Sequence, residues 1–178
     1  MPSLTLILAR ICPTRVGHNG KRDKHITQPH SMSDTPLPDI IPGFSLLSFM
    51  AGTNLAFSEA VGYGVKRLAL SSPYALDQLD VMLKVTEYSS KRFGTVYQPE
   101  PNLLESKLFP RDIARGKTVV LIAHDQGVLD EYAALKRLRE ESDAKGNPKE
   151  AELEIARKFG RLLSYDEAGI EGLIAKHG

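Results

Sequence analysis

Three polar stretches of the chain contain residue types that could support catalysis. Ser71 and Ser72 follow one apolar segment, Tyr97 lies in a second, and His124 and Asp125 follow a third. A serine, a histidine and an aspartate that converge can act as nucleophile, general base and orienting group. The candidate catalytic residues are therefore Ser72, His124 and Asp125.

The same region could instead bind a small anionic ligand. In an open parallel sheet, ligands bind beyond the carboxyl ends of the strands, where helix N-termini present free N–H groups. A charged side chain in the connection between the second and third segments would reach over this edge. The predicted ligand-binding residues are Ser71, Ser72, Tyr97, Arg111, His124 and Asp125.

Helix capping is a simpler explanation of these polar residues. Serine and aspartate are common N-caps, and Ser72 before Pro73 and Asp125 after an apolar run both stand where a cap is needed. Adjacent residues of a strand also point to opposite faces, which disfavours a direct contact between His124 and Asp125. Catalysis, anion binding and helix capping are thus three alternative roles for these residues.

The fold prediction starts from Val119–Ala123, a run of five apolar residues that is typical of a strand buried on both faces. Residues 65–70 and 95–98 predict two more strands, and an amphipathic helix between them would complete a β-α-β unit. The sequence therefore predicts an α/β fold with a small, mainly parallel sheet of three or four strands and flanking helices. The alternative is an α+β fold in which residues 103–109 supply an antiparallel edge strand.

The predicted domain organisation is a leader with a proline-containing linker over residues 1–38, and one globular domain over residues 39–178. Residues 126–178 predict a helical extension, helix-turn-helix-turn-helix. Residues 1–31 have the features of a translated upstream sequence, with Met32 as the working start, or of a mitochondrial transit peptide or a secretory signal. We expect disorder in this leader.

Composition limits the classes of partner and cofactor. With a single cysteine, Cys12, the chain can form neither an internal disulfide nor a cysteine-based metal site, and no cofactor is predicted. His18, His25 and His30 are too widely spaced to predict a metal site. Beyond residue 31 acidic residues outnumber basic ones, which argues against nucleic acid as the main partner, and no apolar run is long enough for a membrane helix.

Two functions of different class follow. The first is a non-catalytic binding or regulatory domain for a small anion or a protein partner, with a homo-oligomer as one form of the latter. The alternative is a small hydrolase or transferase that uses Ser72, His124 and Asp125. The predicted location is the cytoplasm, or the mitochondrion if residues 1–31 are a transit peptide.

Overall fold

The computed structural model describes residues 42–109, 117–146 and 148–177. The chain divides into two units, Met1–Ser45 and Leu46–Gly178, and every helix and strand below belongs to the second unit. The leader, Met32 and Arg111 lie outside the described residues, so the predictions placed on them stay predictions. None of the described helices is both long and apolar enough to cross a membrane.

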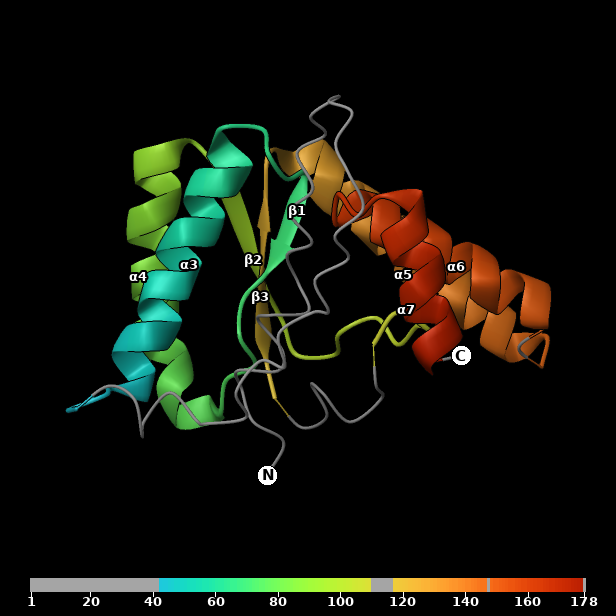
Figure 1. Cartoon of the computed structure of the whole chain (residues 1–178), viewed down its shortest axis with the longest axis horizontal. Coiled ribbons are helices and arrows are strands. Elements are labelled where there is room, and N and C mark those ends of the chain that lie inside the picture. Colours follow the sequence, from blue (N-terminus) through green and yellow to red (C-terminus); the bar gives the residue numbers. More distant parts are fainter. Residues whose placement is uncertain (1–41, 110–116, 147, 178) are drawn as a thin grey trace, which may run out of the picture. The chain divides into compact units, whose positions relative to one another are not determined.

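The described residues contain five helices and three strands (Figure 1). In chain order they are α3 (Leu46–Gly62), β1 (Leu68–Leu70), α4 (Leu76–Phe93), β2 (Val96–Glu100), β3 (Val119–Ala123), α5 (Gln126–Ala144), α6 (Lys149–Leu162) and α7 (Glu167–His177). The C-terminal part is thus three consecutive helices, as its apolar periodicity predicts.

The sheet is antiparallel, and the prediction of a mainly parallel sheet is wrong. The strand order is β1-β3-β2, and β3 runs antiparallel to both neighbours. Glu100 at the end of β2 pairs with Val119 at the start of β3, so residues 101–118 begin and end at the same end of the sheet. A parallel β3 would need a connection that crosses the sheet lengthwise. The α+β alternative therefore fits the fold.

The β-α-β prediction is right that the first two strands run in the same direction, and wrong that they are neighbours in the sheet. Because β1 and β2 are both antiparallel to β3, they run parallel to each other, and α4 connects them. The central strand, however, comes later in the chain and lies between them. The unit is thus a split β-α-β arrangement.

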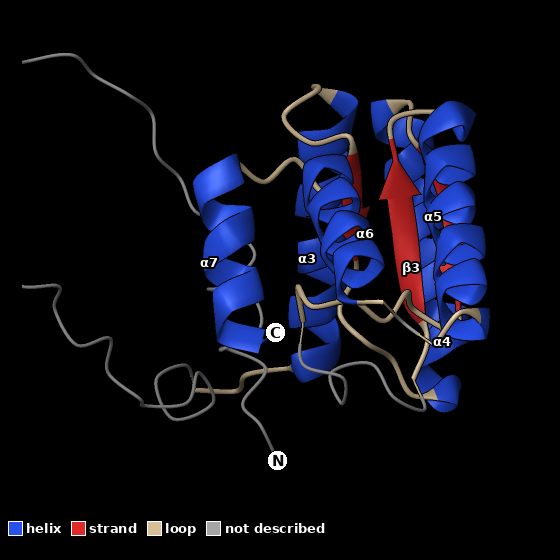
Figure 2. Cartoon of the chain, turned by 90° about the vertical axis from the view of Figure 1, so that its right-hand side faces the viewer, coloured by secondary structure: helices blue, strands red, loops and turns tan. Residues whose placement is uncertain are grey.

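Helices cover both faces of the sheet, as Figures 1 and 2 show, with α3 and α4 on one side and α5, α6 and α7 on the other. All five residues of β3 are buried. Leu121 belongs to the hydrophobic core that contains Phe159 and Ile170 of α6 and α7. Ile122 is fully buried as well and, one residue along the strand, points to the α3–α4 side.

The start of α4 differs from the sequence prediction. The helix begins at Leu76, whereas Ser72 and Pro73 predict a start three residues earlier. Tyr74 is held in extended form instead, because it exchanges two backbone hydrogen bonds with Thr118, of 2.8 and 3.1 Å. The helix is followed by Gly94, whose φ of 70° is left-handed, a conformation that glycine adopts at little cost.

Residues 103–109 form no strand, so the predicted edge strand is wrong. Leu104 and Leu108 of this segment are buried in the core instead, and the ring of Phe109 packs against Phe159 at 6.0 Å between centroids. The segment is therefore a packed connection without regular structure.

Candidate functional site

The antiparallel sheet places Ser71 and His124 at opposite ends. Ser71 donates its backbone N–H to Val120 O at 2.9 Å, whereas the N–H of His124 donates to Arg67 O at 3.0 Å. Val120 and His124 are four residues apart on one strand, which is about 13 Å at the usual rise per residue. The predicted convergence of strand ends therefore does not occur. Neither Ser71 nor the adjacent Ser72 lies beside His124.

Ser71 has a structural role in the sheet. Its hydroxyl is buried, accepts a hydrogen bond from the backbone N–H of Val120 at 2.7 Å, and donates to Ser72 O at 2.9 Å. The side chain thereby replaces a backbone carbonyl and extends the β1–β3 ladder by one residue. Ser72 is 5 % exposed, so its hydroxyl is not presented to a ligand in solution.

Of the remaining predicted site residues, Tyr97 lies in β2 opposite Ile122, toward the His124 end of the sheet. It is half-buried, on an edge strand. Arg111 falls outside the described residues. The structure therefore brings His124 and Asp125 together with neither Ser71 nor Ser72.

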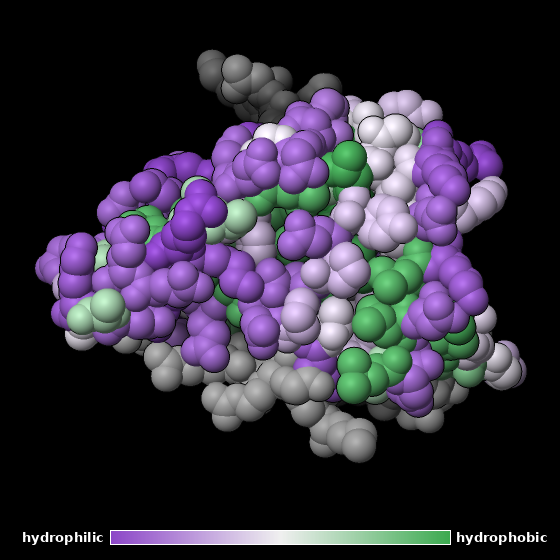
Figure 3. Space-filling view, turned by 180° about the vertical axis from the view of Figure 1, so that it is seen from behind, coloured by the Kyte–Doolittle hydropathy of each residue, from purple (hydrophilic) through white to green (hydrophobic). Residues whose placement is uncertain are grey.

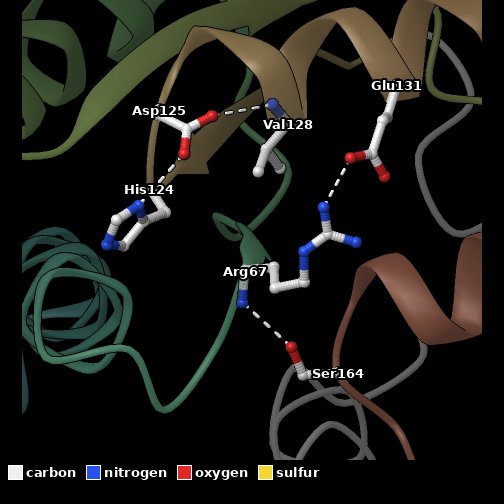
Figure 4. Close-up of polar contacts among 6 residues, drawn as sticks. All are labelled: Arg67, His124, Asp125, Val128, Glu131 and Ser164. Carbon is white, nitrogen blue, oxygen red and sulfur yellow. Dashed lines mark hydrogen bonds and ion pairs between the residues drawn. The ribbon is translucent and has the colours of Figure 1, made fainter.

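His124 and Asp125 do contact each other, contrary to the expectation for adjacent strand residues (Figure 4). His124 Nδ1 lies 3.2 Å from Asp125 Oδ2. The contact is possible because β3 ends at Ala123 and Asp125 already serves as the N-cap of α5, accepting the Val128 N–H at 3.1 Å. The hydrogen bond with His124 is the main cause that lowers the pKa of Asp125. Both side chains are more than half exposed, so water screens the pair.

The capping role of Asp125 bears on anion binding. A helix N-terminus binds anions through its free N–H groups. At α5 the Asp125 carboxylate already accepts a hydrogen bond from the backbone N–H of Val128 at 3.1 Å. A negative charge of the chain itself thus occupies the place that an external anion would take.

Arg67, the arginine drawn in Figure 4, is also engaged. Its guanidinium lies 2.5 Å from Glu131 Oε1, and this hydrogen bond raises the pKa of Arg67. Its backbone N–H donates to Ser164 Oγ at 2.9 Å. Next to it, Lys66 Nζ donates to Leu163 O at 3.1 Å. These contacts fasten the α6–α7 turn to the start of β1.

Ser164 precedes α7 but is not its N-cap. Ser164 adopts a φ of 64° and uses its hydroxyl for Arg67, whereas Asp166 Oδ1 accepts the Gly169 N–H at 2.7 Å and caps α7. Sequence reasoning did not single out Arg67 or Asp166. No local signal marks Arg67, because its partners lie 64 and 97 residues away in the chain.

A second polar cluster lies at the other end of the sheet, and sequence reasoning missed it as well. Glu100, 4 % exposed, accepts hydrogen bonds from Lys136 Nζ and from the Asn102 N–H. Tyr132 Oη accepts the Leu104 N–H at 3.0 Å, and burial raises the pKa of Tyr132. The cluster fastens residues 101–104 to α5, which is a structural role.

Exposed hydrophobic side chains are confined to one layer. Among the described residues, every large hydrophobic side chain that is exposed belongs to α3, to α4 or to the segments that adjoin them. We call this set the α3–α4 surface: Leu46, Leu47, Leu55, Tyr63, Val65, Leu76, Val81 and Tyr88. The helices α5, α6 and α7 contribute none.

Neither a metal site among the described residues nor a similar protein gives a further indication of function. Within residues 42–109, 117–146 and 148–177, no group of three or more histidine, cysteine, aspartate or glutamate side chains could hold a metal ion. Comparisons of the chain with protein-family models, with curated proteins and with solved structures find no match.

Proposed function

We propose that the chain is a non-catalytic protein-binding domain that uses its α3–α4 surface. The observation that carries the proposal is the confinement of exposed large hydrophobic side chains to this layer. Such side chains, when gathered and bordered by polar residues, are typical of protein-binding sites. Figure 3 agrees: hydrophobic patches gather mainly on the half of the view that holds α3 and α4, and the other half is largely hydrophilic.

The polar sites support a non-catalytic role. The enzyme alternative needs Ser72 as nucleophile beside His124 as base, and these residues lie at opposite ends of the sheet. Small-anion binding at the start of α5 competes with the Asp125 carboxylate. A protein partner requires neither site, and it makes use of the apolar side chains that these two functions leave unexplained.

The side chains of α4 indicate the kind of partner. Val81 and Tyr88 are exposed on one side of the helix, and two ion pairs, Asp80–Lys84 and Glu87–Lys91, lie beside them. An apolar stripe with charges of both signs along its flank is complementary to an amphipathic helix of similar pattern. We therefore propose that the α3–α4 surface binds an amphipathic α-helix of a partner protein.

Site-specific photo-cross-linking tests this function. A photoreactive amino acid in place of Tyr88 is expected to form a covalent adduct with a protein partner in the cells that make the chain. The matched control is Ala134, a small exposed residue of α5. Val81→Glu should suppress the adduct from position 88, because it places a charge on the apolar stripe. Equal adducts from both positions, or none from position 88, would contradict the proposal.

A further inference from the structure

We infer that the partner helix is α4 of a second copy of this chain, packed antiparallel about a two-fold axis near Val85. The inference rests on the proposed function and names the partner of the same surface. It is carried by the order of apolar and charged residues on the outer side of α4.

The apolar part of the contact is a stripe of three residues, Val81, Val85 and Tyr88. Their spacing of four and three residues places them on one side of the helix. Val81 is 43 % exposed, Tyr88 is 61 % exposed, and Val85 between them is half-buried. About the proposed axis, Val81 of one copy meets Tyr88 of the other, and Val85 meets its own counterpart.

The charges at the two ends of α4 are complementary in this arrangement. Asp77 lies in the first turn and Arg92 in the last, and both are exposed. Asp77 stands eight residues before Val85 and Arg92 seven after it, so their levels along an antiparallel pair differ by only about 1.5 Å. Asp77 of each copy therefore faces Arg92 of the other.

The flank of the stripe repeats this complementarity. Asp80 pairs with Lys84 at 2.8 Å and Glu87 pairs with Lys91 at 2.6 Å within one copy. The antiparallel arrangement brings Asp80 level with Lys91 of the second copy, and Lys84 level with Glu87, again within about 1.5 Å.

A parallel arrangement about the same stripe would instead place Asp77 opposite Asp77 and Arg92 opposite Arg92. The charge order thus selects one geometry. Exposed ion pairs add little affinity, so the apolar stripe supplies the attraction, and the charges set direction and register. A two-fold contact of this kind closes on itself and yields a dimer.

A charge-swap experiment with the full chain tests the register of the two α4 helices against each other. Sedimentation velocity is expected to show a dimer at micromolar concentration. Asp77→Arg and Arg92→Asp should each weaken the dimer about tenfold, because each places like charges together. The double variant should regain most of the affinity. Within one copy these residues are about 22 Å apart along the helix, so such rescue can arise only between copies.

Loss of folding cannot imitate this result. Both swaps oppose the dipole of α4, so their effects on the thermal midpoint add at concentrations low enough for the chain to be monomeric. There the double variant should melt lowest, although it regains affinity for the second copy. Ala134→Glu, which introduces a charge at an exposed position of α5 outside the α3–α4 surface, should leave the dimer intact.

A disulfide provides a second measurement. With Cys12→Ser, the only native thiol is removed, and Val85→Cys should form a disulfide between copies because it lies at the axis. Leu76→Cys is the exposed control, since nine residues from the axis its two copies are about 27 Å apart along the pair.

A chain that stays monomeric at all concentrations, or a double variant as weak as the single ones, overturns the inference. In that event the cross-linking from position 88 still decides the proposed function separately: an adduct with a different protein would support the binding surface and reject the second copy. Absence of any adduct would reject both.

Discussion

Lys136 Nζ lies 3.0 Å from both carboxylate oxygens of Glu100, whose side chain is only 5 % exposed. The pair joins the last residue of β2 to α5, and Lys136 also donates to Asn102 O at 3.0 Å. Removal of one partner of a buried pair leaves the other charge without compensation. Lys136→Met should therefore lower the free energy of unfolding by about 2–3 kcal/mol, as measured by urea denaturation.

Lys84→Met is the matched control for this prediction. The Lys84–Asp80 pair has a similar distance, 2.8 Å, but both side chains are more than 70 % exposed. The two variants remove the same group from the same residue type. Equal losses of stability in both would show that burial of Glu100 contributes nothing, and would contradict the structural role of the cluster.

Tyr132 provides a prediction about alkaline pH. Burial raises the pKa of its hydroxyl above the usual 10.0, so in the unfolded chain this group ionises at lower pH than in the folded one. Above pH 10 the unfolded state therefore binds fewer protons than the folded state. The protonated Tyr132 hydroxyl contributes fully to stability below pH 10, and this contribution is lost as the pH rises further. Tyr132→Phe should flatten the decline in the free energy of unfolding that begins at about pH 10.

The same variant should also be less stable at neutral pH. Phenylalanine cannot accept the Leu104 N–H, and a buried donor without a partner costs about 1–2 kcal/mol. Tyr74, whose pKa burial also raises, keeps its own contribution in the variant. An alkaline decline of the same steepness in both proteins would mean that Tyr132 ionises freely in the folded state.

Ser71 and Ser72 are expected to differ in their contributions to the stability of the fold. Ser71→Ala removes the acceptor of the buried Val120 N–H and should cost about 1–2 kcal/mol of stability. Ser72→Ala should cost less, because Ser72 contributes its backbone carbonyl to Ser71 and that group remains. Chemical denaturation of both variants checks the order. The reverse order would show that Ser71 does not complete the ladder.

The sequence predicted the position of β3 to the residue and did not predict its direction. Val119–Ala123 is bounded by polar residues on both sides, and a buried strand of this kind shows the same apolar run whether its neighbours are parallel or antiparallel. Direction depends on the connection from β2 to β3, whose described part, residues 101–109, packs Leu104 and Leu108 into the core without regular structure. That packing has no periodic pattern to recognise.

The predicted convergence of Ser71 and Ser72 with His124 does not occur, for a related physical reason. Ser71, Asp125 and Ser164 all have the residue types of helix caps, but only Asp125 caps a helix. The other two hydroxyls bind backbone N–H groups 49 and 97 residues away. Local sequence cannot distinguish a cap from such a long-range contact, because the hydroxyl chemistry is the same in both.

A substitution at Gly62 tests how closely α3 packs on α4 beneath the proposed binding surface. A Cβ added there would lie 2.4 Å from the backbone oxygen of Phe93 and 2.9 Å from its Cβ, and backbone at the end of α4 cannot yield as a flexible side chain can. Gly62→Ala should thus lower stability by about 1–3 kcal/mol, although alanine has the higher helix propensity.

Gly52, at the middle of the same helix, is the matched control, since a Cβ there meets no atom within 4 Å. Gly52→Ala should raise the thermal midpoint, because alanine in a helix interior gains about 1 kcal/mol over glycine. The expected result is a change of opposite sign for the same substitution in one helix. Stabilisation by both substitutions would mean that α3 and α4 do not approach as closely at Phe93 as the structure has them.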